Sequence, residues 1–420
     1  MSAPKIQAIR GVKDILPGEM PSWQVLESTA RTLFDTFGYA EIKIPIFEAT
    51  ELFARGLGAT TDVVEKEMYT FPDLDGKSLT LRPEGTAGAI RAYIEHHLWT
   101  ESPLTKLYYV GPMFRHERPQ AGRFRQFHQV GAEAIGSASP LLDVEQLVLL
   151  DRFFRALGVA PVTLLLNSLG CLLCRPAYRD ALKDFLMTRA SGLCEACQRR
   201  IETNPLRVLD CKREECRALT RDAPAITSYL GPECVGHFDA VRAGLDDVGL
   251  AYTLEPRLVR GLDYYTKTAF EFTAEGLGAQ NTIAAGGRYD GLVEGLGGPP
   301  TPGVGFALGI ERVIALFTKG NPASPSADVF IATLGDHAKR RVIGLVTALR
   351  DAGIRAETDY DQGSLKSQMR RADKLGVRHT VILGDDEIAK GTAVVRDMAT
   401  KAQSDVALSE LVPHLRRLSP

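Results

Sequence analysis

The residues best suited to chemistry lie in residues 106–136, KLYYVGPMFRHERPQAGRFRQFHQVGAEAIG. Both halves have the alternation typical of strands, and the loop between them is charged, with Arg115, Glu117, Arg118, Gln120 and Arg123. A period of two places Gln129, Gly131 and Glu133 on one face of the second strand. That face suits a pocket floor, because two polar groups could orient a ligand and Gly131 would leave room for it. Arg115 could grip a phosphate through two parallel hydrogen bonds. A solvated hairpin with a charged turn would show the same pattern.

Two further segments combine glycine with charged side chains. Residues 303–312, GVGFALGIER, place three glycines before a predicted helix, and Arg312 lies off the apolar stripe of that helix. The dinucleotide fingerprint G-x-G-x-x-G fails, because Leu308 stands at the third glycine position. Residues 80–88, TLRPEGTAG, form a turn that includes Glu84, Gly85 and Thr86. Taken alone, both segments are more commonly explained by glycines used for tight packing and by solvated charges.

A third pair of segments is rich in aromatic residues. Residues 258–272, LVRGLDYYTKTAFEF, carry Arg260, Tyr264 and Tyr265, which could line a polar pocket. Residues 284–292, AAGGRYDGL, contain two adjacent glycines that permit close backbone approach. Buried tyrosines with satisfied hydroxyls and a surface arginine are the structural alternative.

Cysteine spacing predicts a metal site. Cys171 and Cys174 form one C-x-x-C pair, Cys194 and Cys197 form another, and residues 175–193 separate the pairs. This spacing fits a structural zinc ion held by these four cysteines. Cys211 and Cys216 follow closely and could replace one pair. Free thiols in a small helical region are the alternative.

The elements that must position these residues fall into three regions. Residues 1–317 mix predicted antiparallel strands with helices at 23–37, 141–157 and 310–317, which predicts an α+β catalytic domain. Residues 169–255 are mostly helical and hold the cysteines, so they are interpreted as an insertion. Residues 318–327, TKGNPASPSA, have the composition of a linker. Strands and helices then alternate over 328–420, which predicts a small α/β domain with a mainly parallel sheet.

Composition limits the function classes. The chain has 420 residues, 45% of them apolar, which is enough for the cores of two or three domains. The net charge of −2 gives no general basic field, so a nucleic-acid partner would need local basic clusters. Lys366, Arg370 and Lys374 recur every four residues and form such a face. The sequence has no apolar run long enough to cross a bilayer, and residues 1–17 lack a signal-peptide core. Seven cysteines with C-x-x-C spacing fit a reducing compartment, so we expect a cytoplasmic protein without a membrane partner.

Taken together and in this order, the segments resemble the histidyl-tRNA synthetases, a family of class II aminoacyl-tRNA synthetases. FGYAEIKIPIFE is similar to the first class II motif, FRHERPQAGRFRQFHQVGAE to the second and GVGFALGIER to the third. LVRGLDYY and AGGRYDGL are similar to the two segments particular to the histidine enzymes. The resemblance covers essentially the whole chain.

The resemblance implies a class II antiparallel sheet that binds ATP, Mg²⁺ and L-histidine, a C-terminal anticodon-binding domain that meets tRNA(His), and a homodimer. Arg115 and Arg260 would act as the catalytic pair across the α-phosphate, at a place where relatives keep a metal ion. ATP would also contact Glu117, Arg123 and Arg312. Histidine would lie among Glu84, Gly85, Thr86, Arg115, Gln129, Glu133, Arg260, Tyr264 and Tyr265. Arg118 and Gln120 would meet the acceptor end of the tRNA.

Two other functions are weighed against this one. A catalytically inactive paralogue that regulates histidine biosynthesis should lose the phosphate-binding arginines and the anticodon domain, and this chain keeps both. A class II synthetase for another amino acid should lack LVRGLDYY and AGGRYDGL.

Overall fold

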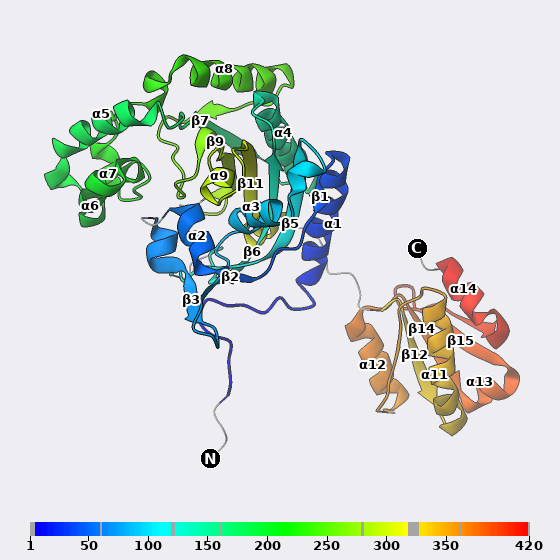
Figure 1. Ribbon diagram of the computed structural model, residues 1–420. Coiled ribbons are helices and arrows are strands. Elements are labelled where there is room, and N and C mark those ends of the chain that lie inside the picture. Colours follow the sequence, from blue (N-terminus) through cyan, green and yellow to red (C-terminus); the bar gives the residue numbers. More distant parts are fainter. Residues whose placement is uncertain are drawn as a thin grey trace. The chain divides into compact units, whose positions relative to one another are not determined.

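The computed structural model describes residues 5–58, 61–118, 122–159, 161–278, 281–317, 327–361 and 363–418. The chain forms two compact units, Met1–Asn321 and Pro322–Pro420 (Figure 1). Of the expected linker at 318–327, only Ala327 is among the described residues. The expected domain limits therefore stay predictions.

An eight-stranded sheet forms the centre of the first unit (Figure 1). Its strand order is β1 (Ala40–Glu41), β5 (Thr105–Phe114), β6 (Gln126–Ile135), β11 (Gly303–Gly309), β10 (Thr282–Arg288), β9 (Thr266–Ala274), β7 (Val162–Ser168) and β8 (Thr253–Leu254). The inner strands pair antiparallel. At the two edges, β1 pairs in parallel with β5, and β8 pairs in parallel with β7. The expected antiparallel catalytic sheet is confirmed.

One face of this sheet carries the main hydrophobic core. The core is built against α1 (Met20–Thr36), α4 (Pro140–Ala156), α8 (Pro232–Asp247) and α10 (Ile310–Phe317). Phe34 lies at its centre, with ring centroids 5.0 Å from Tyr108 and 6.1 Å from Phe306. Strand β6 contributes Val130, Ala132 and Ala134, all fully buried. The opposite face of β6 is thereby left for polar side chains, because alternate residues point to opposite faces.

Smaller elements complete the first unit. They are α2 (Thr50–Leu57), α3 (Thr86–Glu95), α9 (Leu292–Gly295), a π-helical turn (Val63–Glu67) and a three-stranded sheet of order β2 (Phe47–Ala49), β4 (Ser78–Leu81), β3 (Tyr69–Pro72). Small side chains at the start of α3 are fully or nearly fully buried, including those of Thr86, Ala87 and Ala89. They let the first turn of α3 approach the sheet closely.

The helical region between β7 and β8 contains α5 (Arg175–Met187), α6 (Glu195–Thr203), α7 (Glu214–Leu219) and short 3₁₀ turns. These helices share a core of their own that includes Leu182, Cys197, Ile201 and Cys216. Helix α8 differs, because Phe238, Val241 and Leu245 belong to the main core instead. The region expected as one insertion at 169–255 therefore packs as two parts.

The second unit is a five-stranded sheet of order β13 (Ala356–Thr358), β12 (Val329–Leu334), β14 (His379–Gly384), β15 (Thr392–Asp397), β16 (Gln403–Ala407). Its helices are α11 (Asp336–Asp351), α12 (Leu365–Leu375), α13 (Asp385–Lys390) and α14 (Leu411–Leu418). The sheet is mixed and not mainly parallel as expected: β13, β12 and β14 pair in parallel, whereas β14–β15 and β15–β16 pair antiparallel. Helix α13 has six residues and ends at Gly391 (φ +70°), which is too short for a parallel crossover.

No helix among the described ranges of either unit combines the length and apolar composition needed to cross a membrane.

Candidate active site

The polar face of β6 forms the floor of the candidate site. Gln129 pairs with Gly111 of β5 and Gly309 of β11, so a glycine flanks it on either side. Its Oε1 is buried and accepts no hydrogen bond from the described residues. A buried acceptor of this kind is costly unless something binds to it, so it indicates a place where a ligand donor belongs.

Gly131 has a different role from the one expected. A Cβ added to Gly131 would lie 2.3 Å from the ring and the hydroxyl oxygen of Tyr109, its partner on β5. A Cβ on Gly85 would lie 2.1 Å from the same ring. The space above Gly131 is therefore filled by a tyrosine of the protein, and the expectation that it leaves room for a ligand is wrong.

Glu133 lies at the buried end of this floor. Its Oε1 accepts hydrogen bonds from the hydroxyls of Thr86 (2.8 Å) and Tyr109 (3.1 Å), and its Oε2 accepts one from Tyr289 (2.6 Å). Burial raises the pKa of Glu133 to about 8, even though these hydroxyls favour the charged form. A carboxyl group that changes protonation near neutral pH can either donate to or accept from an imidazole nitrogen.

Tyr109 and Tyr289 were not among the residues proposed from the sequence. Tyr289 belongs to the quoted AAGGRYDGL segment, and a Cβ on Gly303 would lie 2.3 Å from its ring. One feature of the sequence could have pointed to Tyr109, which shares a strand face with Leu107 and lies two residues before Gly111. It did not show which residue of β6 the ring would cover.

Glu84 and Thr86 meet at the first turn of α3. The carboxylate of Glu84 accepts hydrogen bonds from the backbone N–H groups of Thr86 and Ala87, both at 2.8 Å. It thereby caps the helix and satisfies donors that a helix start leaves unpaired. Burial raises its pKa. The turn fixes Glu84 beside Glu133, because Thr86 donates to Glu133.

The segment 258–265 brings Arg260, Tyr264 and Tyr265 to the same side. The tyrosine rings have centroids 4.5 Å apart, and the guanidinium carbon of Arg260 lies 5.3 Å from the Tyr265 ring. Arg260 Nη1 donates to Glu271 at 2.6 Å, while its Nε is buried with no described acceptor. Tyr264 lies close enough to Glu84 and Glu133 for both carboxylates to help raise its pKa, after the larger effect of burial.

Arg115 follows β5 directly. Its Nε donates to the carbonyl of Pro83 at 2.8 Å, and its guanidinium carbon lies 5.5 Å from the ring centre of Phe127. Among the described side chains, none accepts from its two terminal nitrogens. This geometry leaves a flat pair of donors available to an anion.

Arg123, Glu117 and Arg312 form the other end of the site. Arg123 pairs with Glu117 at 2.5 Å, and Arg312 donates to the carbonyls of Thr282 (2.6 Å) and Gly122 (3.3 Å). Burial lowers the pKa of Arg312, and the positive charge of Arg123 lowers it further, so the two cations are close. Arginine stays charged despite such shifts, so the pair attracts anions.

Electrostatic neighbours link these groups into a ring. The charge of Glu271, which pairs with Arg260, acts on the pKa of Arg312. The charge of Arg115 acts on the pKa of Glu84. Burial and then Glu117 raise the pKa of Glu67, whereas Arg115 and Arg123 both lower it, so Glu67 lies near both arginines. The site therefore has basic groups on several sides and two buried carboxyl groups at one end.

Two residues were expected to contact the tRNA. Arg118 is exposed, and Gln120 lies outside the described residues. Their expected role stays a prediction.

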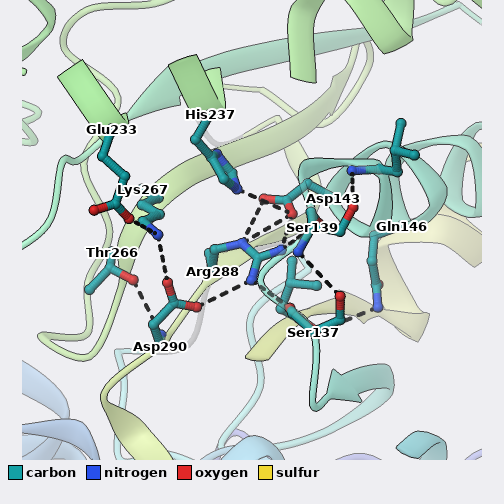
Figure 2. A network of polar contacts seen from close by, with 12 residues as sticks. Ser137, Ser139, Asp143, Gln146, Glu233, His237, Thr266, Lys267, Arg288 and Asp290 are labelled. Carbon is teal, nitrogen blue, oxygen red and sulfur yellow. Dashed lines mark hydrogen bonds and ion pairs between the residues drawn. The ribbon is translucent and has the colours of Figure 1, made fainter. Parts of the chain in front are cut away.

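Arg288 and Asp290 lie beside Tyr289 but belong to a separate buried network (Figure 2). Arg288 Nε donates to both oxygens of Asp143, at 3.2 and 3.1 Å, and both side chains are fully buried. Its Nη atoms donate to the carbonyls of Ser137 and Ser139, both at 2.9 Å. Asp290 links this network to Lys267 at 3.3 Å. The segment thus fixes the loop that carries Tyr289.

The cysteines form two clusters that differ from the predicted quartet. Cys194, Cys197, Cys211 and Cys216 form one cluster, and Cys171, Cys174 and Cys234 form another. The proposed quartet of Cys171, Cys174, Cys194 and Cys197 is therefore wrong. The alternative, in which Cys211 and Cys216 replace one pair, matches the geometry, because α6 and the 209–216 segment bring those pairs together.

Comparisons with known proteins identify the family of the chain. The family model described as histidyl-tRNA synthetase matches residues 11–313, and the one described as an anticodon binding domain matches 328–418. The histidine–tRNA ligase of Geobacter metallireducens is 53% identical over 403 residues, which cover 96% of this chain and 97% of the relative. That of Desulfatibacillum aliphaticivorans is 51% identical over 416 residues, covering 98% and 99%. The crystal structure of the apo histidyl-tRNA synthetase of S. aureus superimposes with a TM-score of 0.83 at 39% identity, covering 98% of this chain and all of that one. The chain therefore belongs to the histidyl-tRNA synthetase family.

Proposed function

We propose that this chain is a histidine–tRNA ligase, which activates L-histidine with ATP and transfers it to the 3′ end of tRNA(His). The observation that carries the proposal is the ring of Arg115, Arg123, Arg260 and Arg312 around a floor that ends in Glu133. Cations suit the phosphates of ATP, and a buried carboxyl group with tyrosines beside it suits an imidazole.

The first step needs these residue types. The histidine carboxylate attacks the α-phosphorus, a new oxygen–phosphorus bond forms, and the bond to the β-phosphate breaks to release pyrophosphate. Negative charge grows on the phosphoryl oxygens, and Arg115 and Arg260 would stabilise it without any proton transfer. Arg123 and Arg312 would hold the leaving pyrophosphate end. The terminal ribose hydroxyl of the tRNA then attacks the acyl carbon, and AMP leaves.

Histidine would be selected by paired polar groups. Glu133 and Tyr265 would hold the imidazole, with Tyr264 beside them, while Glu84, Thr86 and Gln129 would face the α-amino group, with Gly85 in the turn. An amino acid without imidazole nitrogens would make no hydrogen bond to Glu133 or Tyr265, and its side chain would be buried against polar groups that it cannot pair with. Rejection of such analogues follows from that cost.

Glu117 and Glu271 would hold the Mg²⁺ ion that accompanies ATP. The ion takes oxygen ligands and commonly uses one or two carboxylates together with the substrate phosphates. Glu117 and Glu271 fit this requirement, because each pairs with an arginine of the site, Glu117 with Arg123 at 2.5 Å and Glu271 with Arg260 at 2.6 Å. When bound, the ion neutralises charge on the phosphates.

The second unit would recognise the anticodon of the tRNA. Lys366, Arg370 and Lys374 are exposed along α12, while Arg371 pairs with Asp359 at 3.0 Å. A row of exposed positive charges on one helix face matches the negative charges of a phosphate backbone. A cytoplasmic location agrees with seven free cysteines among the described residues.

A homodimer would form through the first motif. Ile46 and Phe47 are exposed there, and Phe71 is exposed on β3, which belongs to the same three-stranded sheet as β2. Grouped apolar side chains on a surface are typical of interfaces. Phe47→Glu should shift the protein from dimer to monomer in analytical ultracentrifugation, and a monomeric parent protein would rule the dimer out.

Amino-acid-dependent exchange of labelled pyrophosphate into ATP tests the function. Histidine should support exchange, while threonine and proline should not. Exchange with another amino acid but not histidine would reject the histidine assignment, and no exchange at all would favour the regulatory paralogue.

A further inference from the structure

Four cysteine sulfurs of the helical region lie together near the active-site loop. The Sγ atoms of Cys194, Cys197, Cys211 and Cys216 are all within 4.8 Å of one another, and Cys194 Sγ is 4.0 Å from Cys211 Sγ. A tetrahedral zinc ion with sulfur ligands at about 2.3 Å places the sulfurs about 3.8 Å apart. A disulfide would need about 2.05 Å. The spacing therefore fits a shared metal ion better than it fits a cross-link.

The chain around these sulfurs has the features of a metal knuckle. Cys194 and Cys197 enclose two residues, and Cys211 and Cys216 enclose the four residues 212–215, as in zinc-binding loops. The backbone N–H of Cys194 donates to Cys216 Sγ at 3.2 Å. Cys197 and Cys216 are fully or nearly fully buried within a small core. So short a segment has little apolar surface of its own to hold it folded.

The cluster of Cys171, Cys174 and Cys234 supplies three sulfurs, and no fourth ligand joins it among the described residues. We therefore assign the metal to the cluster with four.

The four-cysteine cluster is connected to the loop of Arg260 through two paths. Arg207, which follows α6, donates to the carbonyl of Arg260 at 3.4 Å and to Asp62 at 2.9 Å. Asn204 donates to Asp263 at 3.0 Å. Both residues lie in the segment between Cys197 and Cys211, so any displacement of the cluster moves them.

The second path begins at Cys216. The hydroxyl of Thr220 donates to the carbonyl of Cys216 at 2.8 Å. Arg257 donates to the carbonyl of Thr220 at 2.7 Å and to the carbonyl of Leu209 at 3.3 Å. Arg257 lies three residues before Arg260 in the chain. The backbone on both sides of the knuckle thus holds the start of the catalytic loop.

We propose that Cys194, Cys197, Cys211 and Cys216 bind one structural Zn²⁺ ion, and that this ion positions the loop of residues 257–263 and hence Arg260. Binding releases the thiol protons to solvent and leaves four sulfur ligands, so the site needs no further partner. The proposal does not depend on the identity of the amino acid activated, because its primary test is the metal content.

The test compares the full-length protein with Cys211→Ser and with Cys171→Ser. Both cysteines are partly exposed, so each change is matched in burial and chemistry. Proteins purified without added zinc and dialysed against a weak chelator are measured by mass spectrometry of metals. We expect about one zinc per chain in the parent and in Cys171→Ser, and a large loss in Cys211→Ser.

Two measurements keep the test decisive if Cys211→Ser folds poorly. A mercurial reagent should release about one zinc per chain from the parent protein, as seen with a zinc-binding dye. Hydrogen exchange in Cys211→Ser should speed up at residues 257–263 while β6 stays protected, a pattern that global unfolding would not give.

Some results would overturn the proposal. They are less than about half an equivalent of zinc in the parent, wild-type zinc content in Cys211→Ser, or loss of the metal from Cys171→Ser alone. Unchanged exchange at 257–263 in a zinc-free Cys211→Ser protein would refute the positioning role.

Discussion

The hydroxyl of Tyr289 donates a 2.6 Å hydrogen bond to Oε2 of Glu133, although 156 positions separate the two residues in sequence. The bond joins the loop after β10 to the floor strand β6. It also uses one of the two oxygens that would otherwise face the amino acid, so it sets how Glu133 can be oriented.

Tyr289→Phe should weaken histidine binding while leaving the fold intact. The ring still fills the space beside Gly303, but Glu133 loses a donor, which is worth about 1 kcal/mol or several-fold in affinity. The KM for histidine in pyrophosphate exchange should rise by that factor. Tyr93→Phe is the control, because Tyr93 packs in the same cluster as Tyr289, and burial, not Glu133, raises the pKa of its hydroxyl. Equal effects in both variants would contradict a specific role.

Glu133→Gln should change how stability depends on pH. Burial raises the pKa of Glu133 to about 8 in the folded protein, above the ordinary value of 4.5. The folded state then keeps a proton that the unfolded state loses, so the group's contribution is present below pH 4.5 and is lost as pH rises to about 8. Urea unfolding without ligand should show a smaller loss in Glu133→Gln over this range, by up to about tenfold in the unfolding constant per pH unit. Parallel pH profiles for the two proteins would show that the carboxyl is already ionised.

Arg260→Ala should lower the rate of histidine activation much more than it lowers histidine affinity. The guanidinium is proposed to meet charge that grows in the transition state, and losing one such donor costs about 10²–10³ in rate. Pyrophosphate exchange would give kcat and KM separately. Arg155→Ala is a control, since Arg155 is an exposed residue of α4 paired with Asp151. An unchanged kcat would refute the role.

Arg288→Met should destabilise the first unit strongly. It leaves Asp143 buried without its partner, and breaking a buried pair in this way costs about 3–5 kcal/mol. Urea unfolding followed by tryptophan fluorescence would measure the loss. The double variant Arg288→Met/Asp143→Leu should recover part of it, because no uncompensated charge remains. Failure of the double variant to recover any stability would point to the lost Ser137 and Ser139 contacts instead.

The triple variant Lys366→Ala/Arg370→Ala/Lys374→Ala should impair tRNA charging but not pyrophosphate exchange. Removing three phosphate contacts should also reduce the salt dependence of tRNA binding, by about 2 in the slope of log K against log salt. The exposed pair Arg416 and Arg417 on α14 provides the control double alanine variant. Equal loss in both activities would contradict the separation of the two units.

Local patterns in the sequence were sufficient to predict individual elements. The period of two along residues 126–135 gave the polar face of β6. Helical spacing gave α4 and α10 to within one residue and α1 to within three. The antiparallel pairing of β14 and β15 was missed, because the sequence alternates strand and helix there. It depends on α13 being too short to cross the sheet.

Contacts between distant segments were harder to predict. Tyr109 fills the space above Gly131 because of the register of β5 against β6, and a period alone does not set a register. The cysteine pairs could be grouped in several ways by spacing, and the fold of α6 and α7 selects one. Arg288 is fully buried, which is unusual for an arginine, and its partner Asp143 is 145 residues away in the sequence.

The two faces of β6 serve two different purposes along ten consecutive residues: one packs in the core and the other lines the site. Val130, Ala132 and Ala134 face the core, where a change is felt as lost stability, whereas Gln129 and Glu133 face the site. Alternating positions of the same strand therefore answer to different demands, packing on one face and substrate choice on the other.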